Sequence, residues 1–424
     1  MEGQTVKCNR ISAALCLLAG PWMAHVSGQS WEQDVELGWL SGLEWNVFHS
    51  PSSYRDNLGV DIPVDSLILD DRLSIGRMEL DWERDDDQGR WKINSDVSFS
   101  RYNTLTAANR KSLEGRITRE HALNDRIEGA IGIRLRDETR LGINILGDEL
   151  LTSFSFFQAQ LEADLNAQVR SDMELELSWE LFRKWYDQRA TGESLDQTEW
   201  SIELGWSWEP ERRVKGLRDL DLVGQKRTDP LGELTADFQH RQKNYANWLN
   251  LDILDESRDP LLPTPFMPFD STFAHPLRTW TYTTATVRYA LPEWRGWEVR
   301  VDFRAQKRSD LSLGDFGYRD AKSAIRIGHE GDELELTSSL SYTWREYTDR
   351  LAEQITPTPY PLLKYNYLRL DLKAEYRLRK GLLLLGLIDF TQRSSNTTAV
   401  DRRTRRAYQT GSILIGLSAE FNSP

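Results

Sequence analysis

The sequence has very little cysteine and no long apolar run. Only Cys8 and Cys16 are present among 424 residues, and both lie in the first 28. The rest of the chain can form no disulfide, so a large exported fold would have to close its hydrogen bonds in another way. After residue 28, no segment is apolar over the ~20 residues that a membrane-spanning helix requires. This excludes a helical membrane protein.

The N-terminus has the features of a secretory signal. Lys7 and Arg10 precede the apolar run ISAALCLLAGPWMAHV, and Val26-Ser27-Gly28, with small residues suited to a peptidase, follows it. A short charged segment, a short apolar segment and a cleavage site are typical of a signal peptide. We therefore predict that residues 1–28 are a signal peptide and that residues 29–424 form the exported domain.

Period-two alternation dominates the chain from residue 33 onward. In 173–181, for example, apolar side chains occupy the odd positions, with Glu174, Glu176 and Glu180 between them. Such alternation gives a β-strand one apolar and one polar face. We expect strands at 33–49, 72–84, 90–102, 112–123, 126–137, 152–165, 172–185, 197–208, 231–243, 277–291, 296–308, 319–329, 333–346, 364–378, 382–393 and 407–421.

The connections between these segments alternate in length. Links such as 123–125 and 379–381 are tight, whereas links such as 50–71 and 244–276 are long. Strands of about ten residues or more, joined by short periplasmic turns and long extracellular loops, are typical of outer-membrane barrels. Soluble sandwiches and propellers also alternate, but their strands are usually about half as long. We predict an all-β fold, a transmembrane antiparallel up-and-down β-barrel of about 16 strands.

One segment breaks this alternation of connections. Residues 209–229 form a long connection at the end of the barrel where the other connections are short. The segment could contain a short helix, or an extra hairpin that would make the barrel larger.

The ends of the outgoing segments share a composition. Clusters of Arg or Lys with hydroxyl, amide or aromatic neighbours occur at 100–104, 182–187, 241–248, 306–310, 342–349 and 391–397. Together with a last hairpin that begins GLLLLGLIDFTQRSSNT, they resemble the β-barrel porin families of Gram-negative outer membranes. Some members of these families are encoded in exopolysaccharide loci. The resemblance implies an outer-membrane protein that contacts lipid and lipopolysaccharide, and a last strand, ending near Phe421, similar to the signal read by the barrel-assembly machinery.

The polar parity of the strands indicates which residues line the interior. One predicted wall is acidic and another is mixed and partly basic. An acidic side facing a basic side would impose a transverse field on solutes; alternatively, the mixed wall neutralises itself through ion pairs on its own face. The predicted pore-lining residues are Glu174, Glu176, Glu180, Glu199, Glu203, Arg300, Arg304, Lys322, Arg326, Arg369, Lys373 and Arg377.

The arginines that close the outgoing strands are predicted to form an extracellular rim. They are Arg101, Arg183, Arg241, Arg345 and Arg393. Arginine suits the membrane boundary because it has an apolar stem and a polar tip, and it can bind phosphate with two hydrogen bonds. Parity divides the set: Arg101 and Arg183 share the lipid-facing parity of Phe99 and Leu181, whereas Arg345 has the lumen-facing parity.

The long segment 244–276 is rich in proline and unexpectedly apolar. Such a loop should not lie free in water. We expect it either to fold over the barrel mouth and narrow the pore, or to pack on the outer rim or at a contact between copies of the chain.

The sequence contains no recognisable catalytic arrangement. The histidines after residue 28 are scattered, and no metal spacing, phosphate-binding glycine loop or nucleic-acid motif is present. We predict a barrel that is not an enzyme, has no cofactor and binds no nucleic acid. The predicted function is a porin-like channel for passive diffusion of small hydrophilic solutes. Export of polysaccharide and a non-conducting structural or surface-interaction barrel are the alternatives, and homo-oligomers are compatible with each.

Overall fold

The computed structural model describes residues 31–47, 54–55, 61–62, 69–87, 89–143, 149–153, 155–186, 196–213, 228–230, 232–249, 277–311, 317–352, 361–396 and 407–423. The expected signal peptide, and the part of the apolar segment 244–276 from residue 250 onward, lie outside these ranges. Within the described ranges, no helix has the length and apolar character of a membrane span.

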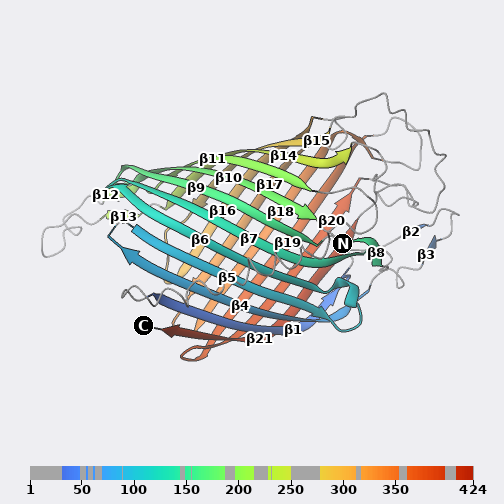
Figure 1. Cartoon of the computed structure of the whole chain (residues 1–424), viewed down its shortest axis with the longest axis horizontal. Coiled ribbons are helices and arrows are strands. Elements are labelled where there is room, and N and C mark those ends of the chain that lie inside the picture. The colour runs from blue at the N-terminus through green and yellow to red at the C-terminus, as the bar shows by residue number, and fades with distance from the viewer. Residues whose placement is uncertain are drawn as a thin grey trace, which may run out of the picture.

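Sixteen long antiparallel strands dominate the described chain (Figure 1). They contain between 12 residues, in β11, and 18, in β18 and β19, which exceeds the nine to eleven or so that a tilted strand needs to cross a bilayer. Their bounds are β1 (Glu32–Trp45), β4 (Asp71–Asp86), β5 (Gly89–Tyr102), β6 (Arg110–Asn124), β7 (Ile127–Ile143), β9 (Phe156–Arg170), β10 (Met173–Tyr186), β11 (Gln197–Trp208), β14 (Glu233–Leu249), β15 (Leu277–Ala290), β16 (Trp297–Asp310), β17 (Tyr318–Glu330), β18 (Leu334–Leu351), β19 (Leu362–Arg379), β20 (Leu382–Ser395) and β21 (Tyr408–Ser423).

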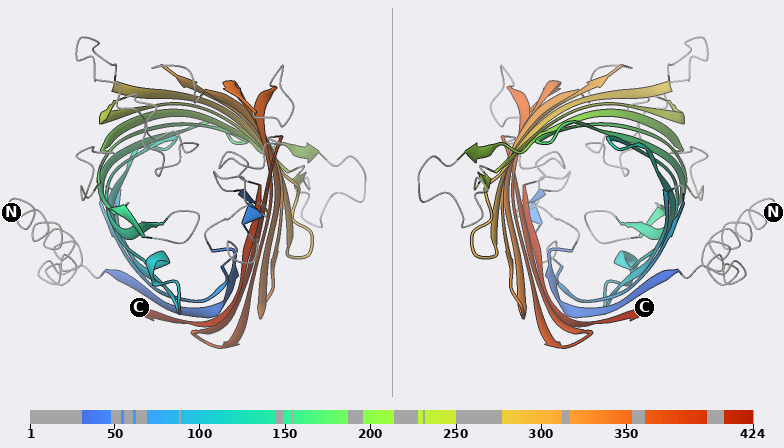
Figure 2. Two further views of the ribbon diagram at one scale, coloured as in Figure 1. Left: turned by 90° about the vertical axis from the view of Figure 1, so that its right-hand side faces the viewer. Right: turned by 90° about the vertical axis from the view of Figure 1, so that its left-hand side faces the viewer.

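The remaining described elements are short. They are β2 (Tyr54–Arg55), β3 (Asp61–Ile62), β8 (Glu149–Ser153), β12 (Glu211–Arg213), β13 (Thr228–Pro230) and the 3-10 helix η2 (Thr106–Ala108). Viewed along the barrel, η2 and β8 lie inside the outline of the wall (Figure 2). The strand bounds place the longer intervals between consecutive strands, such as that between β14 and β15, at the same end as η2.

The sheet closes on itself. β1 pairs with β4 along one edge and with β21 along the other, so that Leu37 lies opposite both Met78 and Ala419. Closure leaves no unpaired sheet edge and satisfies the backbone within the wall, which a chain in lipid requires. The predicted closed up-and-down barrel is therefore confirmed, with the expected strands displaced by a few residues at their ends.

The outer face of the barrel is an apolar belt. Side chains that point away from the lumen are large, apolar and exposed on nearly every strand, as Ile131, Leu204 and Ile415 illustrate. Exposed aromatic residues such as Trp91 and Trp297 stand near the end with the short turns, where aromatic girdles meet the membrane boundary. An even-numbered antiparallel barrel with such a belt is a protein of the bacterial outer membrane.

The segment 209–229 does not enlarge the barrel. β12 and β13 pair with each other in a separate two-stranded sheet and not with the barrel wall. β12 and β13 lie at the end that carries the short turns, at the left of Figure 1. The interpretation of an extra barrel hairpin is therefore wrong, because the pairing partners of β11 are β10 and β14.

One part of the inner wall is apolar rather than polar. Leu73, Tyr102 and Leu414, on three different strands, form a buried cluster against which Leu105 and Ala108 of the η2 region pack. The Asp71 carboxylate fixes this turn by accepting hydrogen bonds from two successive backbone amides, those of residues 104 and 105, each at 2.7 Å. The connection between β5 and β6 therefore folds back onto the inside of the barrel mouth.

Candidate functional site: the charged lumen

The lumen of the barrel is lined by charged and hydroxyl side chains. Cross-strand register fixes which side chains share a face: Glu176 lies opposite Gly205 and Asn166, while Leu177 lies opposite Leu204 and Leu165. The apolar partners are exposed on the outside, so the polar partners face inward. By the same register, all twelve predicted pore-lining residues have the lumen-facing parity of their strands.

The wall formed by β10 and β11 is acidic and mostly without cationic partners. Glu180 accepts a hydrogen bond from the Ser201 hydroxyl at 3.2 Å, and Glu203 accepts one from the Gln239 amide at 2.9 Å. Glu199 is the exception, because its Oε1 lies 3.3 Å from the guanidinium of Arg241. In the described ranges, these carboxylates therefore keep most of their negative charge uncompensated by direct ion pairs.

The wall formed by β16–β19 is mixed. Arg369 pairs with Asp371 at 2.8 Å and Lys373 with Glu375 at 2.5 Å, each within β19. Arg377 donates to the backbone carbonyl of Asp332 at 3.1 Å. Same-face ion pairs thus neutralise part of this wall, as one of the two interpretations of the sequence expected, although they leave cations over on β16 and β17.

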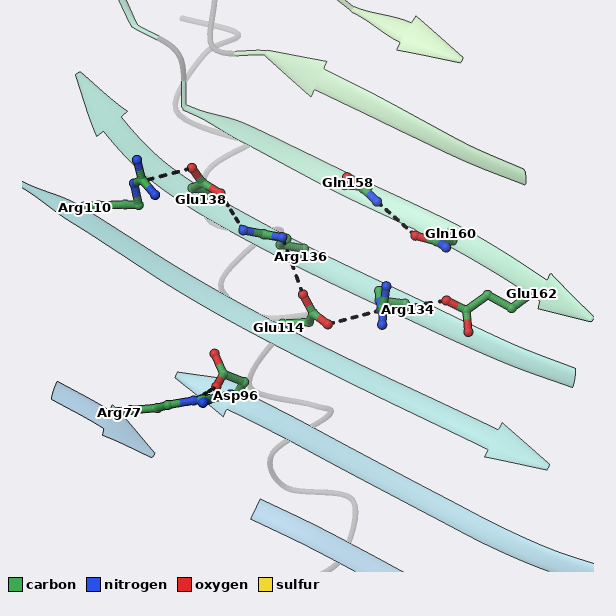
Figure 3. Close-up of polar contacts among 10 residues, drawn as sticks. All are labelled: Arg77, Asp96, Arg110, Glu114, Arg134, Arg136, Glu138, Gln158, Gln160 and Glu162. Atoms are coloured by element: carbon green, nitrogen blue, oxygen red, sulfur yellow. Dashed lines mark hydrogen bonds and ion pairs between the residues drawn. The ribbon is translucent and has the colours of Figure 1, made fainter. Parts of the chain in front are cut away.

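A ladder of alternating charges joins β6, β7 and β9 (Figure 3). Glu114 lies between Arg134, at 3.1 Å, and Arg136, at 3.8 Å. Glu162 of β9 continues the row, 2.5 Å from Arg116 and 3.7 Å from Arg134. These ion pairs cross three strands on the lumen face and hold that part of the wall together.

The ladder is not evident from the sequence alone. In residues 110–138, polar positions alternate with apolar ones, as they do on the strands that were predicted to line the pore. Here, however, the polar positions carry both signs of charge. Net charge along one strand therefore gave no signal. Pairing the strands before reading their charges would have placed Glu114 beside Arg136, its partner in register.

The five predicted rim arginines do not share one environment. Arg101 and Arg183 lie on the lipid-facing parity, where Arg183 covers the ring of Trp185 at 5.2 Å. The other three lie over lumen-facing tyrosines. The ring contacts are Arg241 over Tyr282 at 4.1 Å, Arg345 over Tyr318 at 4.0 Å and Arg393 over Tyr408 at 4.7 Å.

These three arginines belong to a larger aromatic band on the inner wall of the mouth. Tyr245 and Trp280 pack edge to face at 5.2 Å, and Tyr347 packs edge to face against both Tyr318 and Tyr365 at 5.9 Å. Stacked guanidinium groups are held in place by such rings. The band was not predicted, because the sequence places its members far apart on successive strands.

The described residues offer no metal site. Among them, no group of three or more His, Cys, Asp or Glu side chains is placed to hold a metal ion.

Comparison with known proteins gives no family assignment. No protein-family model matches the sequence, and no curated protein is significantly similar to it. Solved structures that share a likeness include the copper transporter OprC, with 10% identity, a TM-score of 0.40 and coverage of 87% of this chain. This chain spans 61% of the length of OprC.

Two further structures cover the chain more evenly. The Pseudomonas putida toluene transporter TodX is 10% identical with a TM-score of 0.35, and the match covers 96% of this chain and 92% of TodX. A bacterial polysaccharide outer membrane secretin is 7% identical with a TM-score of 0.41, and the match covers 92% and 98%. At these values, the cargoes of those proteins say nothing about the solute of this one.

Proposed function

We propose that this chain is an outer-membrane channel through which small hydrophilic solutes diffuse passively. The observation that supports it most directly is the exposure of charged side chains inside the barrel. The Arg77 side chain on β4 is 59% exposed, that of Arg326 on β17 is 53% exposed and that of Arg369 on β19 is 60% exposed. A charged group left in a dry interior costs far more than its ion pairs return, so these positions are in contact with water.

The size of the barrel is consistent with this function. Barrels of about eight strands are filled by their own side chains, whereas those of sixteen or more have an interior wide enough for an aqueous channel. The ion pairs of the ladder run along the wall from strand to strand: Glu114 pairs with Arg136, its partner in register, and with the diagonal neighbour Arg134. The proposed function is also the one that the resemblance to porin families implies.

Liposome swelling with sugars of graded size, combined with conductance in planar bilayers, tests this function. A passive channel gives steady conductance and a swelling rate that falls as the sugar grows. Opening only with a secretion partner present would favour polysaccharide export, and no flux in either assay would favour a structural barrel. Either result would overturn the proposal.

A pair of neighbouring substitutions provides the matched control. Ser341 faces the lumen and Leu340 faces lipid on the same strand. Ser341→Trp places a bulky ring in the channel and should lower the single-channel conductance, whereas Leu340→Trp should leave it unchanged. Folding of both variants is checked by the shift of the barrel on unheated gels.

A further inference from the structure

Two neighbouring strands place like charges directly opposite each other on the lumen face. In the register of β16 and β17, Arg304 lies opposite Lys322 and Arg300 lies opposite Arg326. Opposite charges in such cross-strand pairs stabilise a sheet, whereas like charges destabilise it. The arrangement is therefore unfavourable for the sheet alone.

The nearby carboxylates compensate these cations only in part. Asp302 pairs with Arg326 at 3.1 Å. Asp320, which is buried, is shared by Arg304 at 3.6 Å and Arg345 at 2.9 Å. In the described part of the chain, no carboxylate lies within ion-pair distance of Arg300 or Lys322. The wall thus has an excess of positive charge at this level.

Short hydroxyl side chains stand beside these cations. On the lumen face of β18, Thr343 lies opposite Lys322 and Ser339 lies opposite Arg326. Ser341, between them in sequence, lies opposite Arg369 of the next strand. Because Ser and Thr are short, the longer cationic side chains of β17 and β19 extend past them into the lumen on either side.

We propose that these residues bind the phosphate or carboxylate group of an anionic solute. The cation–hydroxyl patch consists of Lys322, Arg326 and Arg369 together with the half-buried Ser339 and Thr343, and the buried Ser341 lies beneath it. Guanidinium groups offer paired N–H donors to such an anion, an ammonium offers a compact charge, and hydroxyls donate single hydrogen bonds. A bound anion would also relieve the repulsion between the opposed cations of β16 and β17. This assignment rests on the proposed channel function, since it names the class of solute that the channel recognises.

The ion pairs already present in the patch do not prevent it from binding an anion. Arg369 is largely exposed and its partner Asp371 is 38% exposed. Exposed ion pairs of this kind contribute little to stability because water screens both charges. An incoming dianion can therefore displace the Asp371 contact at little cost, while Asp320 remains committed to two arginines.

The test is anion binding to the folded full-length barrel in detergent, measured by calorimetry with inorganic phosphate and, separately, with citrate. Lys322→Gln/Arg369→Gln should weaken binding of at least one of the two anions by about tenfold or more, because it removes two charged hydrogen-bond donors. The control is Lys307→Gln/Arg319→Gln, which removes the same charge from the outward-facing parity of β16 and β17. It should bind as the wild type does.

Comparing the two anions distinguishes their chemistry. Tighter binding of phosphate assigns phosphorylated solutes, and tighter binding of citrate assigns organic acids. Absence of binding to the wild type, or equal loss in the patch and control variants, would overturn the assignment. Because calorimetry does not depend on ion flow, a barrel that binds anions but does not conduct contradicts the channel function and leaves the patch intact.

Discussion

The Ser418 hydroxyl donates a hydrogen bond to Oε1 of Glu36 at 2.7 Å, across the seam between the last strand and the first. Ser418 is 1% exposed, so this contact is shielded from water. It accompanies continuous backbone pairing of β1 with β21. Closure at this seam gives the wall two separate faces, and the division between lipid and lumen depends on it.

The seam leaves no space for a side chain at Gly416. A Cβ there would overlap the backbone carbonyl of Trp39. We therefore expect Gly416→Ala to weaken closure and lower the folded fraction seen as a shifted band on unheated gels. Gly386→Ala on the neighbouring strand is the control, because the nearest atom is 3.9 Å away. Equal behaviour of the two variants would contradict the observed register of the seam.

The apolar belt predicts that arginine substitutions at two adjacent positions differ in their effect on the free energy of unfolding. Leu177 faces outward, whereas Ser178 faces the lumen between Glu176 and Glu180. Leu177→Arg should reduce the free energy of unfolding by up to about 2–4 kcal/mol, because arginine is costly on a lipid-facing surface. Ser178→Arg should cost much less, since the acidic wall attracts it. Urea unfolding from lipid vesicles measures both, and similar losses would argue against the assigned faces.

The charge ladder predicts a cost for losing its buried carboxylate. The Glu162 side chain is 6% exposed and contacts Arg116 and Arg134. Glu162→Gln should destabilise the barrel by about 1–3 kcal/mol, because it leaves charged donors without their acceptor. Glu176→Gln, at an exposed carboxylate of the acidic wall, should change the unfolding free energy by less than about 0.5 kcal/mol. The same urea titration reports both, and the ladder would have no structural role if the two changes were equal.

The sequence predicted the barrel well because period-two alternation directly records two environments. Leu175 and Leu177 alternate with Glu174 and Glu176, and each long strand repeats this pattern. Closure of the barrel extends this pattern to every strand, because each strand then has one face toward lipid and one toward the lumen. Apolar and polar side chains must therefore alternate along it. The predicted strand ends differ from the observed ones by a few residues, because the polar ends of strands and the connections between them have similar compositions.

The contacts within the lumen could not be predicted in the same way. Whether Arg345 reaches lipopolysaccharide or a lumen-facing ring depends on its neighbours Tyr318 and Asp320, which come from a different strand. Likewise, the opposition of Arg304 and Lys322 follows from the register of β16 and β17. A shift of one residue would turn one member of each pair to the other face, and the sequence alone does not fix the register.

Cysteine labelling at two adjacent positions tests the division between a wet lumen and a lipid-facing surface most directly. Glu203 and Leu204 are neighbours on β11; Leu204 is 54% exposed on the outer face, and Glu203 lies on the lumen face. Each is replaced by cysteine in a chain with Cys8 and Cys16 changed to serine, and the barrel in liposomes is treated with a charged maleimide that does not enter lipid. A wet lumen and a lipid-facing outer surface predict rapid labelling at position 203 and protection at position 204. Equal labelling of both positions, or labelling at 204 alone, would contradict it.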